Sequence, residues 1–182
     1  MVEMLTEKER ESAINRLTRS RQALLDAVDG ITEPQARWKP APDRWSILEY
    51  VEHLAVSDDA LVQMIRRSLE TPPQPETEEQ RRAREQKIRE TQMPRGVNRA
   101  PQMLQPGGKF ASLGDAVSAF LAARERTLEF ARTTQDDLRS HFSPHTVLGP
   151  MDGYQWLTAN AHHAESHSAH IKELREMPDF PR

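Results

Sequence analysis

Four of the seven histidines in the sequence fall within a nine-residue stretch near the C-terminus: His162, His163, His167 and His170. Residues four apart lie on one face of an α-helix, so a helix here would bring the ring nitrogens of His163 and His167 close together. A pair with this spacing can bind one divalent metal ion, as in zinc enzymes that carry two histidines on one helix. His170 falls on the same face, whereas His162 points about 100° away.

The face that carries these histidines is also the apolar face of its segment. Trp156 and Leu174 lie on it, while Glu165 and Lys172 point the other way. We therefore expect the histidines to face the protein interior. A buried imidazole needs partners for its ring nitrogens, and either a metal ion or backbone carbonyls and water can supply them. Spacing alone leaves both interpretations open.

His53 is a third candidate ligand, on a different predicted helix. It lies beside the apolar stripe that contains Ile47 and Leu54. From that position it can point toward His163 and His167, or it can be hydrogen-bonded at the surface. Three histidine ligands would leave at least one coordination position open, as catalytic metal sites require.

Composition excludes several other classes of site. The chain of 182 residues has no cysteine, so it has no disulfide, thiolate zinc site, iron–sulfur cluster or cysteine nucleophile. With 25 basic and 28 acidic residues, its net charge is −3, unlike that of a typical nucleic-acid-binding domain. No segment approaches the ~20 apolar residues of a membrane span, and residues 1–6 lack the apolar core of a signal peptide. We expect a cytoplasmic protein that binds neither nucleic acid nor membrane.

Apolar residues at helical spacing predict four long helices. Their expected ranges are about 6–29, 46–70, 112–133 and 152–177. Ser46 with Glu49 has the pattern of a capping box, and Asp152 with Gln155 marks the start of the fourth helix. Strand-type alternation is absent, and residues 134–151 are expected to be an irregular connection. The predicted fold class is therefore all-α, in a single domain that spans residues 1–182.

A proline-rich crossover is expected at about 71–111, between the second and third long helices. Six of the thirteen prolines fall there, so the stretch cannot form one continuous element. A short helix is predicted at about 78–89, and its basic run, Arg81 to Lys87, is expected to be a solvated face. A connection of this length allows the helices on either side to run parallel within a four-helix bundle.

Two motifs resemble the signatures of the DinB-like superfamily, and the resemblance covers nearly the whole chain. The first is Trp45-Ser46-Ile47-Leu48-Glu49-Tyr50-Val51-Glu52-His53-Leu54, and the second is Gly153-Tyr154-Gln155-Trp156-Leu157 followed by His163-x-x-x-His167. The resemblance implies an up-down-down-up four-helix bundle, often dimeric. It also implies a divalent metal, zinc or nickel, bound by His53, His163 and His167. His170 stands where many relatives have Gln, and it either supports these ligands or replaces one of them.

The resemblance also implies an enzyme with a small-molecule substrate, and we expect it to be a homodimer. The metal would act as a Lewis acid, either for hydrolysis or for a transfer that uses a low-molecular-weight thiol as co-substrate. Glu49 is a candidate base, but its capping role explains it without catalysis and is the interpretation we favour, and no catalytic residue is assigned. The alternative is a metal- or ligand-binding stress-response protein without turnover. His141, His145 and His162 are expected to lie outside the ligand set. For His141 and His145 we favour a loop surface over the alternative, a position lining the mouth of the site.

Overall fold

The structure is a computed structural model that describes residues 4–90 and 101–182, so part of the predicted crossover lies outside the described residues. The elements, in chain order, are α1 (Glu7–Val28), α2 (Glu33–Arg37), α3 (Ile47–Leu69), α4 (Glu78–Glu90), the 3₁₀ turn η1 (Gln102–Leu104), α5 (Leu113–Thr133), β1 (Phe142–His145), β2 (Gly149–Asp152) and α6 (Gly153–Arg175).

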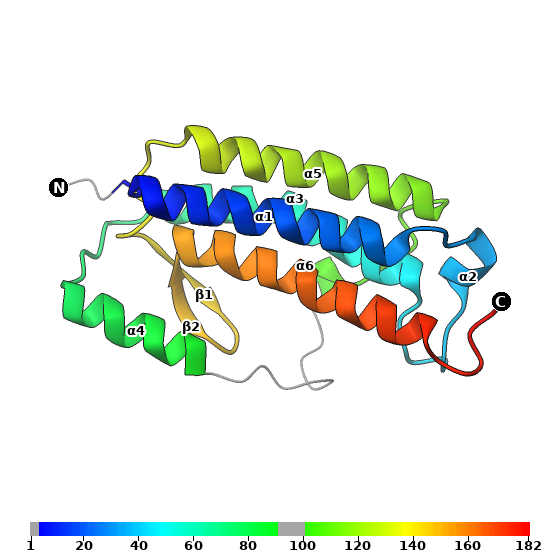
Figure 1. Ribbon diagram of the computed structural model, residues 1–182. Helices are drawn as coiled ribbons and strands as arrows, with labels where there is room; N and C mark the ends of the chain where they lie inside the picture. The colour runs from blue at the N-terminus through cyan, green and yellow to red at the C-terminus, as the bar shows by residue number, and fades with distance from the viewer. Residues whose placement is uncertain (1–3, 91–100) are drawn as a thin grey trace.

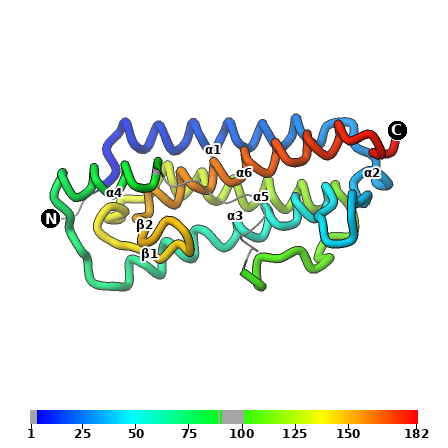
Figure 2. The backbone as a smooth tube through the Cα atoms, turned by 90° about the horizontal axis from the view of Figure 1, so that it is seen from below, coloured from blue at the N-terminus to red at the C-terminus, as the bar shows by residue number. Residues whose placement is uncertain are grey.

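The four long helices form the predicted bundle. Figure 1 shows that α1 and α6 run in one direction and that α3 and α5 run in the other, which is the up-down-down-up order. Helix α1 packs mainly against α6, and α3 packs mainly against α5. Parallel neighbours cannot be joined by a tight turn, which explains the long chain between α3 and α5 (Figure 2).

Local capping signals fix where the long helices begin. Reciprocal capping boxes pair Thr6 with Glu9, Ser46 with Glu49, and Asp152 with Gln155. The Ser112 side chain accepts a hydrogen bond from the Asp115 amide at the start of α5. Each interaction satisfies an amide that has no partner within its helix, so the starts predicted from the sequence are confirmed.

The apolar core consists of two clusters along the bundle. Leu24, Leu54, Phe120, Ile171 and their neighbours fill the half near α2. Leu17, Ile65, Leu128, Leu157 and their neighbours fill the other half. Burial of each such side chain contributes roughly 1.5–3 kcal/mol to the free energy of unfolding.

Within residues 4–90 and 101–182, the helices are all too short or too polar to cross a membrane.

A β-hairpin lies in the connection at residues 134–151, where we expected irregular chain without strands, while the fold remains the predicted, mostly helical bundle. Strand β1 pairs antiparallel with β2, and Pro144 lies directly opposite Pro150. Prolines normally argue against a strand, because they have no amide to donate. A two-stranded ribbon tolerates them at a pair that exchanges no hydrogen bonds. Gly149, with a φ of 79°, supplies the left-handed backbone that follows the turn.

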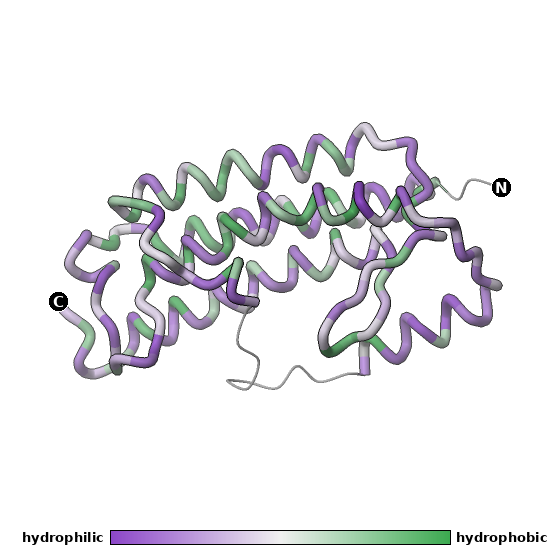
Figure 3. The backbone as a smooth tube through the Cα atoms, turned by 180° about the vertical axis from the view of Figure 1, so that it is seen from behind, coloured by the Kyte–Doolittle hydropathy of each residue, from purple (hydrophilic) through white to green (hydrophobic). Residues whose placement is uncertain are grey.

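Helix α4 is predominantly hydrophilic (Figure 3), yet its basic run is not simply solvated. Arg84 bonds Glu76 at 2.6 Å and the fully buried Asp152 at 3.0 Å. The expectation of a solvated face is therefore wrong for Arg84. Its partners lie outside its own helix, so the local sequence does not reveal them.

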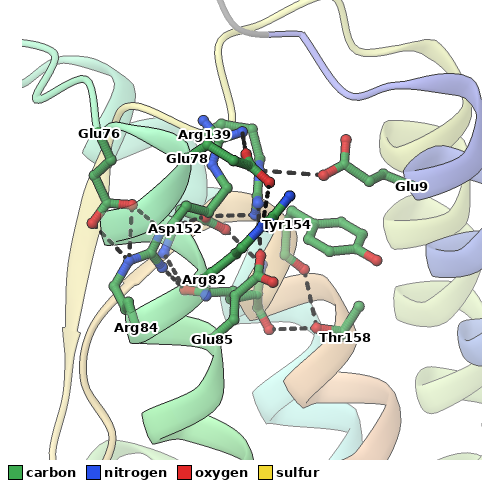
Figure 4. Close-up of polar contacts among 12 residues, drawn as sticks. Glu9, Glu76, Glu78, Arg82, Arg84, Glu85, Arg139, Asp152, Tyr154 and Thr158 are labelled. Carbon is green, nitrogen blue, oxygen red and sulfur yellow. Dashed lines mark hydrogen bonds and ion pairs between the residues drawn. The ribbon is translucent and has the colours of Figure 1, made fainter.

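A second arginine completes this network at the start of α6 (Figure 4). Arg139 donates hydrogen bonds to Asp152 at 2.7 Å and to Glu85 at 2.8 Å, and its Nε forms an ion pair with Glu9 at 3.4 Å. Asp152 meanwhile caps α6 through the Gln155 amide. One buried carboxylate thus joins α4, α6 and the hairpin, and Arg139 extends the connection to α1.

Arg124 forms a separate buried cluster in the middle of the bundle. Its guanidinium bonds Asp58 at 2.6 and 3.1 Å, Ser20 at 2.9 Å, Asn160 at 3.2 Å and the Leu17 carbonyl at 3.5 Å. These contacts use all five of its N–H donors. Since the partners lie on α1, α3 and α6, the cluster connects all four long helices.

Candidate metal centre

His53 from α3 and His163 and His167 from α6 converge on one point. The Nε2 atom of His163 lies 3.0 Å from that of His53 and 2.9 Å from that of His167. One nitrogen from each ring lies within 4.8 Å of the other two. The sequence pattern of two residues on one helix and one on another therefore produces a compact three-nitrogen cluster.

The positions of the three rings follow from the helices that carry them. His53 is buried, with 4% of its surface exposed, while His163 and His167 are half-buried one turn apart on α6. The Trp45 side chain is half-buried, and the centre of its ring lies 4.9 Å from that of the His53 ring. Tyr50 packs against His167 at 5.2 Å. Aromatic rings thus line one side of the cluster.

A backbone carbonyl fixes the tautomer of His53. Its Nδ1 lies 2.7 Å from the carbonyl oxygen of Leu104, in η1. Because a carbonyl can only accept, Nδ1 carries the proton and, in the neutral ring, Nε2 presents its lone pair to the other two histidines. A histidine that binds a metal through Nε2 commonly has this second hydrogen bond, which orients the ring.

The cluster cannot satisfy its own nitrogens when the three rings are neutral. Nε2 of His163 can carry one proton, and it can donate a full hydrogen bond to Nε2 of His53 or to Nε2 of His167, but not to both. The Nε2 lone pair of the other ring then has no donor. In addition, Nδ1 of His167 is buried and has no hydrogen-bond partner in the described part of the chain. A divalent cation bound by all three Nε2 atoms would use every converging lone pair. The donor set therefore fits such an ion.

Burial keeps these rings neutral. It lowers the pKa of His163 to about 3, with a further contribution from the neighbouring His53. Burial also lowers the pKa of His167 to about 2, with a contribution from His163. The pKa of His53 is lowered by burial, which the Leu104 hydrogen bond partly offsets. Neutral imidazole is the form that binds metals.

The other candidate residues lie outside the cluster. The ring of His170 is 5.6 Å from that of His167, and His170 is not part of the converging group. Glu49 accepts the Ser46 amide at 2.7 Å and pairs with Lys39 at 2.9 Å, so both of its carboxylate oxygens are engaged. The capping interpretation of Glu49 accounts for its position.

The remaining histidines differ in their surroundings. His162 is exposed, as expected. His141 is buried, so a loop-surface position is wrong for it. His145 is half-buried at the end of β1, where its ring lies 5.3 Å from that of Trp156. The hairpin, which the sequence does not predict, thus places His145 against the helix that carries His163.

Two features of the site are missed by sequence reasoning. The Leu104 carbonyl that holds His53 is a backbone atom, so no residue type reveals it. Glu52, adjacent to His53, is buried with 1% of its surface exposed, and its carboxylate accepts backbone amides of the crossover. The one signal of this role in the sequence is an acidic residue directly beside the candidate ligand His53 in an otherwise apolar stretch of helix.

Similarity to known proteins agrees with this architecture. Residues 16–171 match the DinB superfamily. The uncharacterised protein YuaE of Bacillus subtilis (strain 168) is 24% identical over 149 residues, which is 82% of this chain and 88% of YuaE.

Two solved structures share the fold. TT2238, described as a four-helix bundle protein, has a TM-score of 0.58 at 21% identity, over 89% of this chain and 96% of its own. YfiT from Bacillus subtilis, described as a probable metal-dependent hydrolase with an unusual four-helix bundle topology, has a TM-score of 0.61 at 19% identity, over 95% of this chain and 89% of its own.

Proposed function

The chain belongs to the DinB superfamily, and from this premise we propose that it is a metal-dependent hydrolase. The residues that hold the divalent ion, zinc or nickel, are His53, His163 and His167. The observation that carries the proposal is the convergence of their Nε2 atoms, 3.0 and 2.9 Å apart in successive pairs. The shared fold of YfiT, a probable metal-dependent hydrolase, supports the same reaction class.

Three protein ligands are what a catalytic site requires, since a structural zinc site usually has four. No other His, Cys, Asp or Glu joins the three histidines in residues 4–90 and 101–182. When bound, the ion supplies a Lewis acid for polarising a carbonyl or phosphoryl oxygen of a small-molecule substrate. The chain's own contribution is to fix the donor atoms, through the Leu104 carbonyl at His53, and to shield one side with Trp45 and Tyr50.

A low-molecular-weight thiol is the co-substrate to test beside water. The chain has no cysteine, so any sulfur nucleophile must come from solution. Hydrolysis and thiol transfer need the same exchangeable position at the ion and differ in the nucleophile. If the rate depends on added thiol, the proposed reaction is a thiol-dependent transfer and not hydrolysis.

The test begins with protein stripped of metal and reloaded with cobalt(II). Esters, amides and phosphoesters with chromogenic leaving groups are then screened with and without an added thiol. We expect turnover that follows the cobalt content, stops on chelation and is absent from the His167→Ala variant. Stoichiometric cobalt whose absorption no thiol or anion alters, together with no turnover, would contradict the proposal and favour a non-catalytic metal-binding protein.

Assembly and partners stay predictions. The homodimer implied by the family can be checked by light scattering of the purified protein. The net charge of −3 predicts no binding to duplex DNA at any salt concentration, which a mobility-shift assay can measure. The cytoplasmic location expected from the sequence is likewise a prediction.

A further inference from the structure

Glu52 holds the end of the crossover against α3. Its Oε1 accepts the amides of Gly107 at 2.7 Å and Lys109 at 3.1 Å, and its Oε2 accepts the amide of Gly108 at 3.2 Å. The residue is 1% exposed. A buried carboxylate is costly unless hydrogen bonds satisfy it, and here three consecutive backbone amides do so.

The segment held by Glu52 is the one that orients His53. Leu104 lies three residues before Gly107. Its carbonyl oxygen accepts a hydrogen bond from Nδ1 of His53, 2.7 Å away. Glu52 and His53 are consecutive on α3, so two neighbouring side chains hold one short stretch of the crossover at two points. Gly108, with a φ of 74°, supplies the backbone turn that brings the amides onto the carboxylate.

From this arrangement we propose that Glu52 is a positioning residue for the metal centre. By fixing residues 107–109, it holds the Leu104 carbonyl where it sets the tautomer and the orientation of His53. The crossover then positions a residue of the metal site in addition to connecting α3 and α5. This inference rests on the proposed metal site, which must bind an ion for Glu52 to matter in this way.

The chain offers a matched control in Glu33. Its carboxylate accepts one backbone amide, that of Leu113, at 2.7 Å, also near the end of the crossover. That contact holds the start of α5 and is separate from the contacts of His53. Glu33 is exposed, unlike Glu52, so Glu33→Gln makes the same chemical change at a carboxylate that accepts a backbone amide and tests that change alone, without touching the histidine cluster.

The experiment compares cobalt(II) binding by the wild type, Glu52→Gln and Glu33→Gln. A glutamine at position 52 keeps one acceptor oxygen and turns an amide group toward a backbone N–H. We expect the cobalt affinity of Glu52→Gln to fall by about 10–100-fold, the usual effect of losing a group that orients a ligand. Its visible absorption spectrum should also change. Glu33→Gln should match the wild type in affinity and spectrum.

Hydrogen exchange of the wild type gives a second readout that needs no variant. Metal binding and the ordering of residues 104–109 are linked, so each must stabilise the other. Adding cobalt or zinc should slow exchange at the amides of Gly107, Gly108 and Lys109, while the Leu113 amide should change little. If Glu52→Gln fails to fold, unchanged exchange at these three amides on adding metal is enough to overturn the role of Glu52.

The outcomes separate the two proposals. A wild type that binds no metal overturns the metal site and this inference with it. A wild type that binds metal, with unchanged exchange at residues 107–109 and unchanged binding in folded Glu52→Gln, overturns the role of Glu52 alone. Slower exchange with metal, together with weaker binding in Glu52→Gln and normal binding in Glu33→Gln, supports it.

Discussion

Two of the buried polar clusters in the described part of the chain satisfy their polar atoms to very different degrees. Around Arg124, all five N–H donors meet acceptors from the chain itself, and the Asp58 carboxylate pairs with them. Around His163, three ring nitrogens converge without a donor for every lone pair, and the buried Nδ1 of His167 has no partner in the described part of the chain.

We propose that the complete cluster stabilises the fold and that the incomplete cluster binds a ligand. Buried polar atoms in native proteins nearly always have partners, so an incomplete set indicates a partner from outside the chain. The Arg124 cluster is complete and connects four helices. The histidine cluster is incomplete and lies between only two of them, α3 and α6, with η1 at its edge.

The largest expected effect comes from opening the complete cluster. Asp58→Ala leaves the Arg124 charge buried without its main partner, which should cost about 3–5 kcal/mol in the free energy of unfolding. Denaturant titration measures this change. The neighbouring Asp59→Ala is the control, because Asp59 pairs with Arg126 at the surface and should cost less than about 1 kcal/mol. Equal losses for the two variants would show that the buried cluster does not stabilise the fold.

Removing the metal from the incomplete cluster should have a smaller effect on the fold. At 100-fold excess over its dissociation constant, a bound ion stabilises the folded state by about 2.7 kcal/mol. Chelation should lower the melting temperature accordingly, yet leave the helical circular dichroism signal intact, since the core and the Arg124 cluster do not involve the ion. Collapse of the helical signal on chelation would instead assign the ion a structural role.

Glu49 should behave as part of the fold although it lies one turn before His53. Glutamine can also serve in a capping box, so Glu49→Gln should change the free energy of unfolding by less than about 1 kcal/mol. Turnover, once a substrate is known, should stay within a few-fold of the wild type. A rate loss of about 10²–10⁴, the usual contribution of a general base, would make Glu49 catalytic.

Signals that act over a few residues could be interpreted from the sequence alone. The capping boxes at Ser46 and Asp152 involve residues three apart, and the helical spacing of His163 and His167 lies within one turn. These features depend on local geometry, which the order of residues determines directly. The long proline-containing connection only allowed α3 and α5 to run parallel, and the resemblance to the DinB-like superfamily implied the bundle order.

Features that depend on distant partners could not be predicted in this way. Arg84 lies 68 positions from Asp152, and Arg124 lies 66 from Asp58, so neither pair has a local pattern. The hairpin was hidden by Pro144 and Pro150, which are usually evidence against strands. The convergence of His53 with the other two histidines depends on how α3 and α6 pack against each other. The Leu104 carbonyl is a backbone group, so the residue types do not reveal its role.

The most direct test of the metal centre is elemental analysis of purified protein. Wild type and His170→Ala should each contain one divalent ion per chain, whereas His53→Ala, His163→Ala and His167→Ala should contain less than a tenth of that amount while remaining folded. His170 is the matched control, since it lies on the same helix next to the cluster without joining it. Full metal occupancy in all three ligand variants would contradict the central claim.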